Sequence, residues 1–400
     1  RGREMAKRKW LKISLVVVVL LAIVAGIAGA GVAVYRQRKQ HGYLNRANEL
    51  YAQGNWLLAR RQYALYLFQK PDDTAVLLKY ADACTRIYDN RDEALGEAAR
   101  AYVLISQRDP DNIDAQDKFL DLQKKNAAWG DIEYYATSFL KRRPDDPKLL
   151  NLHAHALLRL GRREEATNAL RGLVDTGIAE PGAYGDLAML LHDRQLDSQA
   201  WDVLNKALQQ HPDDPRIRAQ RVLYALVTRD LKVAEIEVGE ALRAGPSDPD
   251  ALLAAMRFEM VRGQWDKAVA YGEQVVARAP DRAEVYVPLA ESYSRQGALT
   301  KAIDFLAGLD QEILIDNPKI MVSLIDLQMT AGRQEDARAT NQRLLKARPA
   351  NIILQDYFRG RMLLLDGKPE EAASILETVV VREPSFAPPH VYLALAYLDI

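Results

Sequence analysis

The feature that most constrains the fold of this chain is an alanine that returns at a fixed interval. Five of these alanines stand 34 residues apart, and two copies of the tetrapeptide PDDP, Pro144–Pro147 and Pro212–Pro215, are separated by twice that interval. The series consists of Ala59, Ala98, Ala166, Ala200, Ala234, Ala268, Ala302, Ala337 and Ala372, with Ile132 at one intermediate position. A fixed period of this length indicates copies of one supersecondary unit, each of which buries its apolar face against the next. We therefore expect one array rather than several unrelated domains.

The unit itself is predicted to be a pair of helices. Beyond His41 apolar residues recur at i, i+3, i+4 and i+7, and Gly or Pro interrupts this pattern about every 15 residues. Glycine tends to stand five residues before each alanine of the series, and proline tends to follow twelve residues after it. Glycine closes a helix in the left-handed conformation, alanine allows two helices to approach closely, and Pro followed by Asp suits the start of the next helix. PDDP is thus interpreted as the joint between successive pairs.

This pattern resembles the tetratricopeptide repeat (TPR), a helix–turn–helix unit of 34 residues. The segments that carry the resemblance are GYLNRANELYAQGNWLLARRQYALYLFQKP, RFEMVRGQWDKAVAYGEQVVARAP and RMLLLDGKPEEAASILETVVVREP. In the first segment the matching residues are Tyr43, Ala47, Gly54, Trp56, Ala59, Tyr63 and Pro71. The resemblance implies an all-α fold, a right-handed α-solenoid of about ten to eleven helix-turn-helix TPR units.

The resemblance also implies the limits of the array. Ten repeats are expected over residues 40–386, with about five extra residues around Tyr88–Gly96 in the second. Residues 387–400 are expected to be the first helix of a truncated eleventh repeat. Three repeats depart from the pattern because Ala127, Gln195 and Arg229 stand where the glycine is expected.

The N-terminal region has the pattern of a membrane anchor. Residues 13–35, ISLVVVVLLAIVAGIAGAGVAVY, carry no charge, and as a helix they would span roughly 35 Å, enough for a hydrocarbon core of about 30 Å. A basic N-terminal segment, 1–12, precedes them and a basic juxtamembrane linker, 36–39, follows. We expect a transmembrane helix over 13–35, although Ala28-Gly29-Ala30 resembles a cleavage site and leaves open a soluble exported adaptor.

The distribution of basic residues bears on orientation and on partners. Six basic residues precede the apolar span and four follow it in a comparable stretch, which favours the bulk of the chain outside the cytoplasm, whereas counted from Met5 the numbers are four and four. With no sign of organelle targeting, a bacterial inner membrane with the repeats in the periplasm is expected. Residues 1–39 hold nine of the 54 Lys and Arg but one of the 54 Asp and Glu, so the rest of the chain has a net charge of −8. Nucleic acid is therefore not expected as a partner, because phosphate binding requires a basic face.

The sequence assigns no catalytic, cofactor-binding or metal-binding residue. The single cysteine, Cys84, excludes an intramolecular disulfide and a zinc site built from cysteines. His153 and His155 are two apart on a predicted helix and point in different directions, whereas a metal pair favours i and i+4. The chain also offers no glycine-rich phosphate loop outside residues 13–35 and no setting for an activated nucleophile. We therefore do not expect an enzyme, a cofactor or a small-molecule substrate.

The resemblance implies a function in binding proteins. The first helices of such repeats line the inner groove of a superhelix, which accepts extended peptides or helices. By register the partner-binding groove positions include Asn151, His155, Met189, Leu223, Leu253, Arg257, Val287, Glu291, Asp326, Tyr357 and Arg361. The expected function is a membrane-anchored protein–protein interaction scaffold in cell-envelope assembly or secretion. The alternative is the substrate-recruiting region of an enzyme, such as a glycosyltransferase or signalling protein, whose catalytic domain lies beyond residue 400.

Overall fold

The computed structural model describes residues 35, 37–348 and 352–400, and over these residues the regular structure is helical throughout. The first helix occupies 37–52. It is followed by α2 Trp56–Gln69, α3 Thr74–Thr85, α4 Arg91–Arg108, α5 Ile113–Lys125, α6 Trp129–Leu140, α7 Pro147–Arg159, α8 Arg163–Thr176, α9 Pro181–His192, α10 Asp197–Gln210, α11 Pro215–Val227, α12 Leu231–Ala244, α13 Pro249–Val261, α14 Trp265–Arg278, the 3₁₀ turn Ala283–Val285, α15 Tyr286–Arg295, α16 Leu299–Ala307, α17 Gln311–Asp316, α18 Pro318–Thr330, α19 Gln334–Ala347, α20 Ile352–Leu365, α21 Pro369–Arg382 and α22 Ala387–Asp399. The all-α expectation is confirmed for this part of the chain.

The expected transmembrane helix at 13–35 lies outside the described residues except for Tyr35. Within the described ranges no helix combines the length and the apolar character that crossing a bilayer requires.

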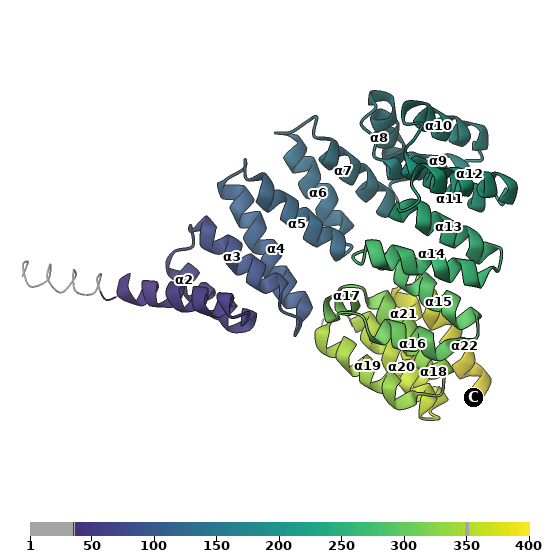
Figure 1. Ribbon diagram of the computed structural model, residues 1–400. Coiled ribbons are helices and arrows are strands. Elements are labelled where there is room, and N and C mark those ends of the chain that lie inside the picture. The colour runs from purple at the N-terminus through teal and green to yellow at the C-terminus, as the bar shows by residue number, and fades with distance from the viewer. Residues whose placement is uncertain (1–34, 36, 349–351) are drawn as a thin grey trace, which may run out of the picture. The chain divides into compact units, whose positions relative to one another are not determined.

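The chain divides into two units, which we describe separately. The first consists of residues 1–87 and 93–119, and the second of residues 88–92 and 120–400. In the first unit the first helix packs against α2 and α3 through a core of Ala47, Leu50, Ala59, Tyr63, Tyr66 and Val76. In the second unit first helices contact their own second helices, as in the pairs α7 with α8, α9 with α10, α11 with α12 and α13 with α14 (Figure 1).

The first helices of neighbouring pairs also pack on one another in the second unit. α11 lies against both α9 and α13, so these three helices form a continuous inner layer. The alanines of the 34-residue series sit where helices meet, and Ala166, Ala200 and Ala234 have no exposed surface. Their small side chains permit the close approach that the period predicts.

The joints between pairs are built as the PDDP sequence indicates. Asp146 caps α7 by accepting a hydrogen bond from the backbone N–H of Leu149, and Pro147 occupies the first turn. Asp214 caps α11 through the N–H of Arg216, and Pro215 follows it in the same way. Each cap satisfies a backbone donor that a helix start otherwise leaves unpaired.

The three repeats that lack the expected glycine nevertheless make the same turn. Ala127, Gln195 and Arg229 adopt φ values of 52°, 62° and 59°, close to the 73° of Gly161 and the 69° of Gly263. Residues with a Cβ atom are strained in this left-handed region. The contacts of the surrounding helices thus hold a turn that the local sequence does not favour.

The five residues Tyr88–Asp92, which belong to the second unit, pack against α17 and the end of α19. The guanidinium of Arg91 donates to both carboxylate oxygens of Asp316 at 2.8 Å, and its side chain is 3% exposed. Arg348 lies 2.6 Å from Asp92 and also donates to the carbonyl of Ile315. The region where the sequence carries extra residues is therefore ordered by ion pairs with positions far along the chain.

Candidate partner-binding site

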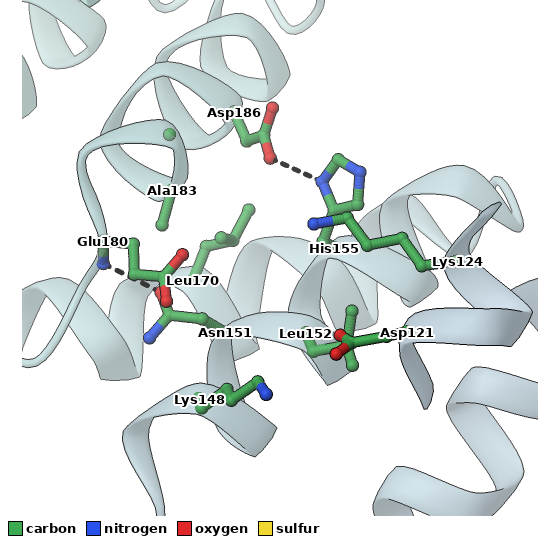
Figure 2. Close-up of a pocket in the computed structure, with 11 residues that line it drawn as sticks. Asp121, Lys124, Lys148, Asn151, Leu152, His155, Leu170, Glu180, Ala183 and Asp186 are labelled. Atoms are coloured by element: carbon green, nitrogen blue, oxygen red, sulfur yellow. Dashed lines mark hydrogen bonds and ion pairs between the residues drawn. The ribbon is translucent and has the colours of Figure 1, made fainter. Parts of the chain in front are cut away.

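The end of α5, which belongs to the second unit and carries Asp121 and Lys124, lines a pocket of about 220 Å³ together with α7, α9 and Leu170 of α8. Two of the predicted groove residues, Asn151 and His155, belong to it. The lining consists of Asp121, Lys124, Lys148, Asn151, Leu152, His155, Leu170, Glu180, Gly182, Ala183 and Asp186. Figure 2 shows the charged side chains around an apolar floor to which Leu170 and Ala183 contribute. The pocket thus arises because repeat-to-repeat packing brings equivalent faces of neighbouring first helices together.

His155 connects three helices at this pocket. Its Nδ1 atom lies 3.0 Å from Oδ2 of Asp186 on α9, as the dashed line in Figure 2 marks. The edge of its ring also meets Trp129 of α6, with 5.3 Å between the ring centroids. These two contacts fix the imidazole, so it presents a defined polar edge and leaves part of the ring in solvent.

Asn151 lines the pocket and holds the backbone around it through hydrogen bonds of its side chain. Its Nδ2 atom donates to the carbonyls of Pro147, at 2.7 Å, and Ile178, at 3.0 Å, and its Oδ1 accepts from the N–H of Glu180 at 2.9 Å. The side chain is buried and its hydrogen bonds are made with the backbone. Asn151 therefore positions the connection between α8 and α9 and leaves partner contact to its neighbours.

The charges around the pocket are mixed. Asp121, Glu180 and Asp186 supply carboxylates, and Lys124 and Lys148 supply ammonium groups. In Figure 2 the amine of Lys124 extends toward the ring of His155. Such a set, around an apolar floor, suits hydrogen bonds and ion pairs with a polypeptide segment. No hydroxyl or thiol side chain lines the pocket, and no group of three His, Cys, Asp or Glu among the described residues could hold a metal ion.

The middle groove positions lie on the first helices, as the register predicts. Met189, Leu223, Arg257 and Val287 are half-buried on α9, α11, α13 and α15, and Leu253 is buried. Glu291 is exposed and pairs with Arg295 at 3.6 Å. That a partner contacts these residues remains a prediction.

The last three groove positions form an internal cluster instead of an open surface. Arg361 has no exposed side-chain area, and its guanidinium lies 2.5 Å from Oδ1 of Asp326. The guanidinium stacks 4.1 Å from the ring centroid of Tyr392 on α22, and its Nη1 donates to the hydroxyl of Tyr357 at 3.1 Å. Tyr357 is likewise fully buried, so only Asp326 of the three reaches the surface.

Burial governs the ionisation of this cluster. It raises the pKa of the Tyr392 hydroxyl to about 12, while the positive charge of Arg361 opposes the shift. The pKa of Tyr357 is raised for the same reason. Both phenols are therefore neutral near pH 7, and Tyr392 donates a hydrogen bond to Asp326 at 3.1 Å.

Sequence reasoning missed several residues of these two sites. Asp186 and Tyr392 are not among the predicted groove positions. Asp186 nevertheless contacts His155, and Tyr392 contacts Arg361, and both of these are predicted positions. The available signal was the repeat itself, because Asp326 and Arg361 are opposite charges at equivalent positions one repeat apart. Reading such positions as pairs, and not singly, would have indicated the Asp326–Arg361 contact.

Comparison with known proteins agrees with the repeat assignment. The family described as tetratricopeptide repeat matches residues 151–215 and 259–313. No curated protein matches the chain in sequence.

Solved structures with a similar arrangement of helices include yeast Tom70, which is 11% identical, with 91% of this chain and 96% of that chain covered and a TM-score of 0.47. The crystal structure of the APC/C hetero-tetramer Cut9-Hcn1 is 13% identical, with 75% of this chain and 58% of that chain covered and a TM-score of 0.42. Pseudomonas aeruginosa pilF is 17% identical, with 55% of this chain and 97% of that chain covered and a TM-score of 0.41.

Proposed function

Because the chain belongs to the tetratricopeptide repeat superfamily, we propose that it is a protein–protein interaction scaffold whose first-helix face binds segments of partner proteins. The observation that carries the proposal is the pocket on α5, α7 and α9, where charged side chains of both signs surround an apolar floor. Fixed groups such as His155, held by Asp186, offer a partner hydrogen bonds without the cost of ordering a mobile side chain.

A photo-crosslinking residue at Leu152, on the pocket wall, tests this function. A partner segment in the pocket is expected to crosslink there and not at Ile236, which is exposed on the second helix α12. The double variant Lys124→Glu and Lys148→Glu should abolish the crosslink because it removes both pocket cations. The matched control, Lys232→Glu and Lys267→Glu, makes the same change of charge at exposed positions on α12 and α14 and should retain it. Equal loss in both variants, or equal crosslinking at Leu152 and Ile236, would refute the assignment.

We further propose that residues 13–35 anchor the scaffold in a membrane and that it acts in cell-envelope assembly or secretion. Support comes from the uncharged stretch of 23 residues with basic residues on both sides. A bacterial inner membrane with the repeats in the periplasm is the proposed location, and the excess of basic residues before the span supports that orientation. The variant Leu20→Arg and Leu21→Arg should convert the protein from resistant to extractable by alkaline carbonate. Extraction of the unmodified chain under the same conditions would contradict the anchor.

A further inference from the structure

The outer face of α2 carries an exposed apolar stripe in the first unit. Phe68 is 88% exposed, and Leu65 and Leu57 on the same side of the helix are 45% and 42% exposed. Arg61 lies between them and is also exposed. Apolar side chains that gather on one exposed helix face, as these three do, indicate a surface that meets something apolar.

The packing of α2 on the first helix fixes where this stripe lies. The ring of Tyr51, at the end of the first helix, contacts Trp56 at the start of α2, with 5.1 Å between centroids. Further along α2, the hydroxyl of Tyr63 donates to Oδ1 of Asn48 at 2.9 Å. The two helices are therefore antiparallel, and Tyr43 near the start of the first helix packs into the core that α2 shares with it. The end of α2 that carries Leu65 and Phe68 thus returns to the beginning of the first helix.

The beginning of that helix follows the apolar segment directly in the chain. The described helix begins at residue 37, and Tyr43 lies six residues further on, which corresponds to about 9 Å of helix. The polar layer on each side of a bilayer is about 5–8 Å thick, given a total of about 40–45 Å and a core of about 30 Å. Residues level with the start of the first helix would consequently lie at or just above the lipid headgroups.

The charges near this end of α2 fit an anionic lipid surface. Arg38 and Lys39 stand at the start of the first helix and Lys70 follows α2 immediately. Of the two carboxylates that come next, Asp72 pairs with Arg108 at 2.8 Å, and Asp73 accepts hydrogen bonds from the Tyr66 hydroxyl and the N–H of Val76. Within the stripe, Arg61 can extend its guanidinium toward headgroup phosphates while its methylene groups stay near the apolar residues. Aromatic residues such as Phe68 and Tyr35 are also favourable near the membrane interface.

We propose that the C-terminal end of α2 docks on the lipid interface of the membrane that holds the anchor, with Phe68 and Leu65 inserted at headgroup depth. This inference rests on the proposed anchor at 13–35. It adds a second membrane contact, which would hold the first helical pair against the bilayer instead of leaving it on a flexible tether. Leu57, about 16 Å further along α2 from Phe68, would remain outside the lipid.

The test places a fluorescent label at each end of the stripe in the full chain. In a Cys84→Ala background, Phe68→Cys and the matched control Leu57→Cys are labelled with an environment-sensitive nitrobenzoxadiazole group. Both proteins are reconstituted in vesicles of phosphatidylcholine and phosphatidylglycerol that contain spin-labelled headgroups. We expect a blue-shifted emission and strong quenching at position 68, and water-like emission without quenching at position 57. Resistance to alkaline carbonate is measured on the same samples.

Each other outcome overturns the docking in a recognisable way. If the protein resists carbonate but the label at 68 is not quenched, the anchor stands and the docking of α2 is wrong. A blue shift at 68 without lipid quenching indicates a protein neighbour, such as a second copy of the chain, and also refutes a lipid contact. Equal quenching at 57 and 68 contradicts the proposal that only the C-terminal end of α2 reaches the lipid. Extraction of the protein by alkaline carbonate would refute both the anchor and the docking.

Discussion

The Asp326–Arg361 pair allows a sharp prediction because its two members are not equally buried. Arg361 has no exposed side-chain area, whereas the side chain of Asp326 is 40% exposed. Replacing Asp326 by Asn leaves the guanidinium buried without an anion, and replacing Arg361 by Met removes the charge and largely keeps the volume. The two substitutions break the same contact but leave very different groups behind.

The expected costs follow from that difference. Breaking a buried pair so that a charge remains unpaired costs about 3–5 kcal/mol. The rings of Tyr392 and Tyr357 still face the guanidinium, so for Asp326→Asn we expect about 3 kcal/mol, the lower end of that range. Arg361→Met should cost less than about 1.5 kcal/mol, since volume-conserving replacements are tolerated and the remaining Asp326 carboxylate is hydrated and keeps the Tyr392 hydroxyl.

Native-state hydrogen exchange of amides in α18 and α20 measures these costs locally, as a repeat array requires. A loss of about 3 kcal/mol corresponds to exchange roughly a hundredfold faster, while Arg361→Met should change the rate by less than about tenfold. Amides of α11, several repeats away, serve as an internal control and should not change. The reasoning fails if Arg361→Met accelerates exchange as much as Asp326→Asn, or if the double variant is less stable than Asp326→Asn alone.

Three further outcomes are expected. Ala127→Gly should raise the free energy of unfolding by up to about 1 kcal/mol, because Ala127 has a φ of 52° that glycine adopts without strain; a loss in urea melts would contradict this. Asn151→Ala should lower it by about 2 kcal/mol because it removes the hydrogen bonds of the side chain to the backbone at Ile178 and Glu180, whereas a neutral result in the same melts would show that these hydrogen bonds do not stabilise the connection between α8 and α9. Burial raises the pKa of the Cys84 thiol from its ordinary 9.0 to about 12. Unfolding above pH 9 therefore releases a proton, so the contribution of Cys84 to stability is present below pH 9 and is lost between pH 9 and about 12. Rapid reaction of the native protein with a disulfide reagent at pH 8 would show that the thiol is not buried.

Much of the fold could be predicted because its determinants are local in the sequence. The spacing of the alanines and the Pro–Asp joints indicates helical pairs, and Asp146 and Asp214 cap helices as their positions suggest. The turns at Gln195 and Arg229 have no such local signal, since neither residue favours a positive φ. Those turns follow from the packing of the helices on either side.

The candidate site was less predictable than the fold because the exposure of a groove side chain depends on which side chains of the neighbouring repeat cover it. Register placed Arg361 and Leu223 at comparable positions, but Tyr392 covers the guanidinium of Arg361, and Leu223 is only half-buried. Likewise nothing in the residues around Asn151 indicates that its side chain is occupied by the backbone at Ile178, 27 residues away. A periodic pattern identifies the face of a helix, and the contacts of each face must be found in the structure.

The capped joints have a consequence for how such a chain can change in length. Asp146 with Pro147, and Asp214 with Pro215, start their helices from signals contained within the joint. A duplication or deletion of one whole 34-residue unit would therefore recreate an intact joint, while an insertion of any other length within a helix would disturb its packing. The binding face can therefore lengthen or shorten by one repeat at a time. Duplication or deletion of a single repeat would change the length of the partner segment that the chain accommodates.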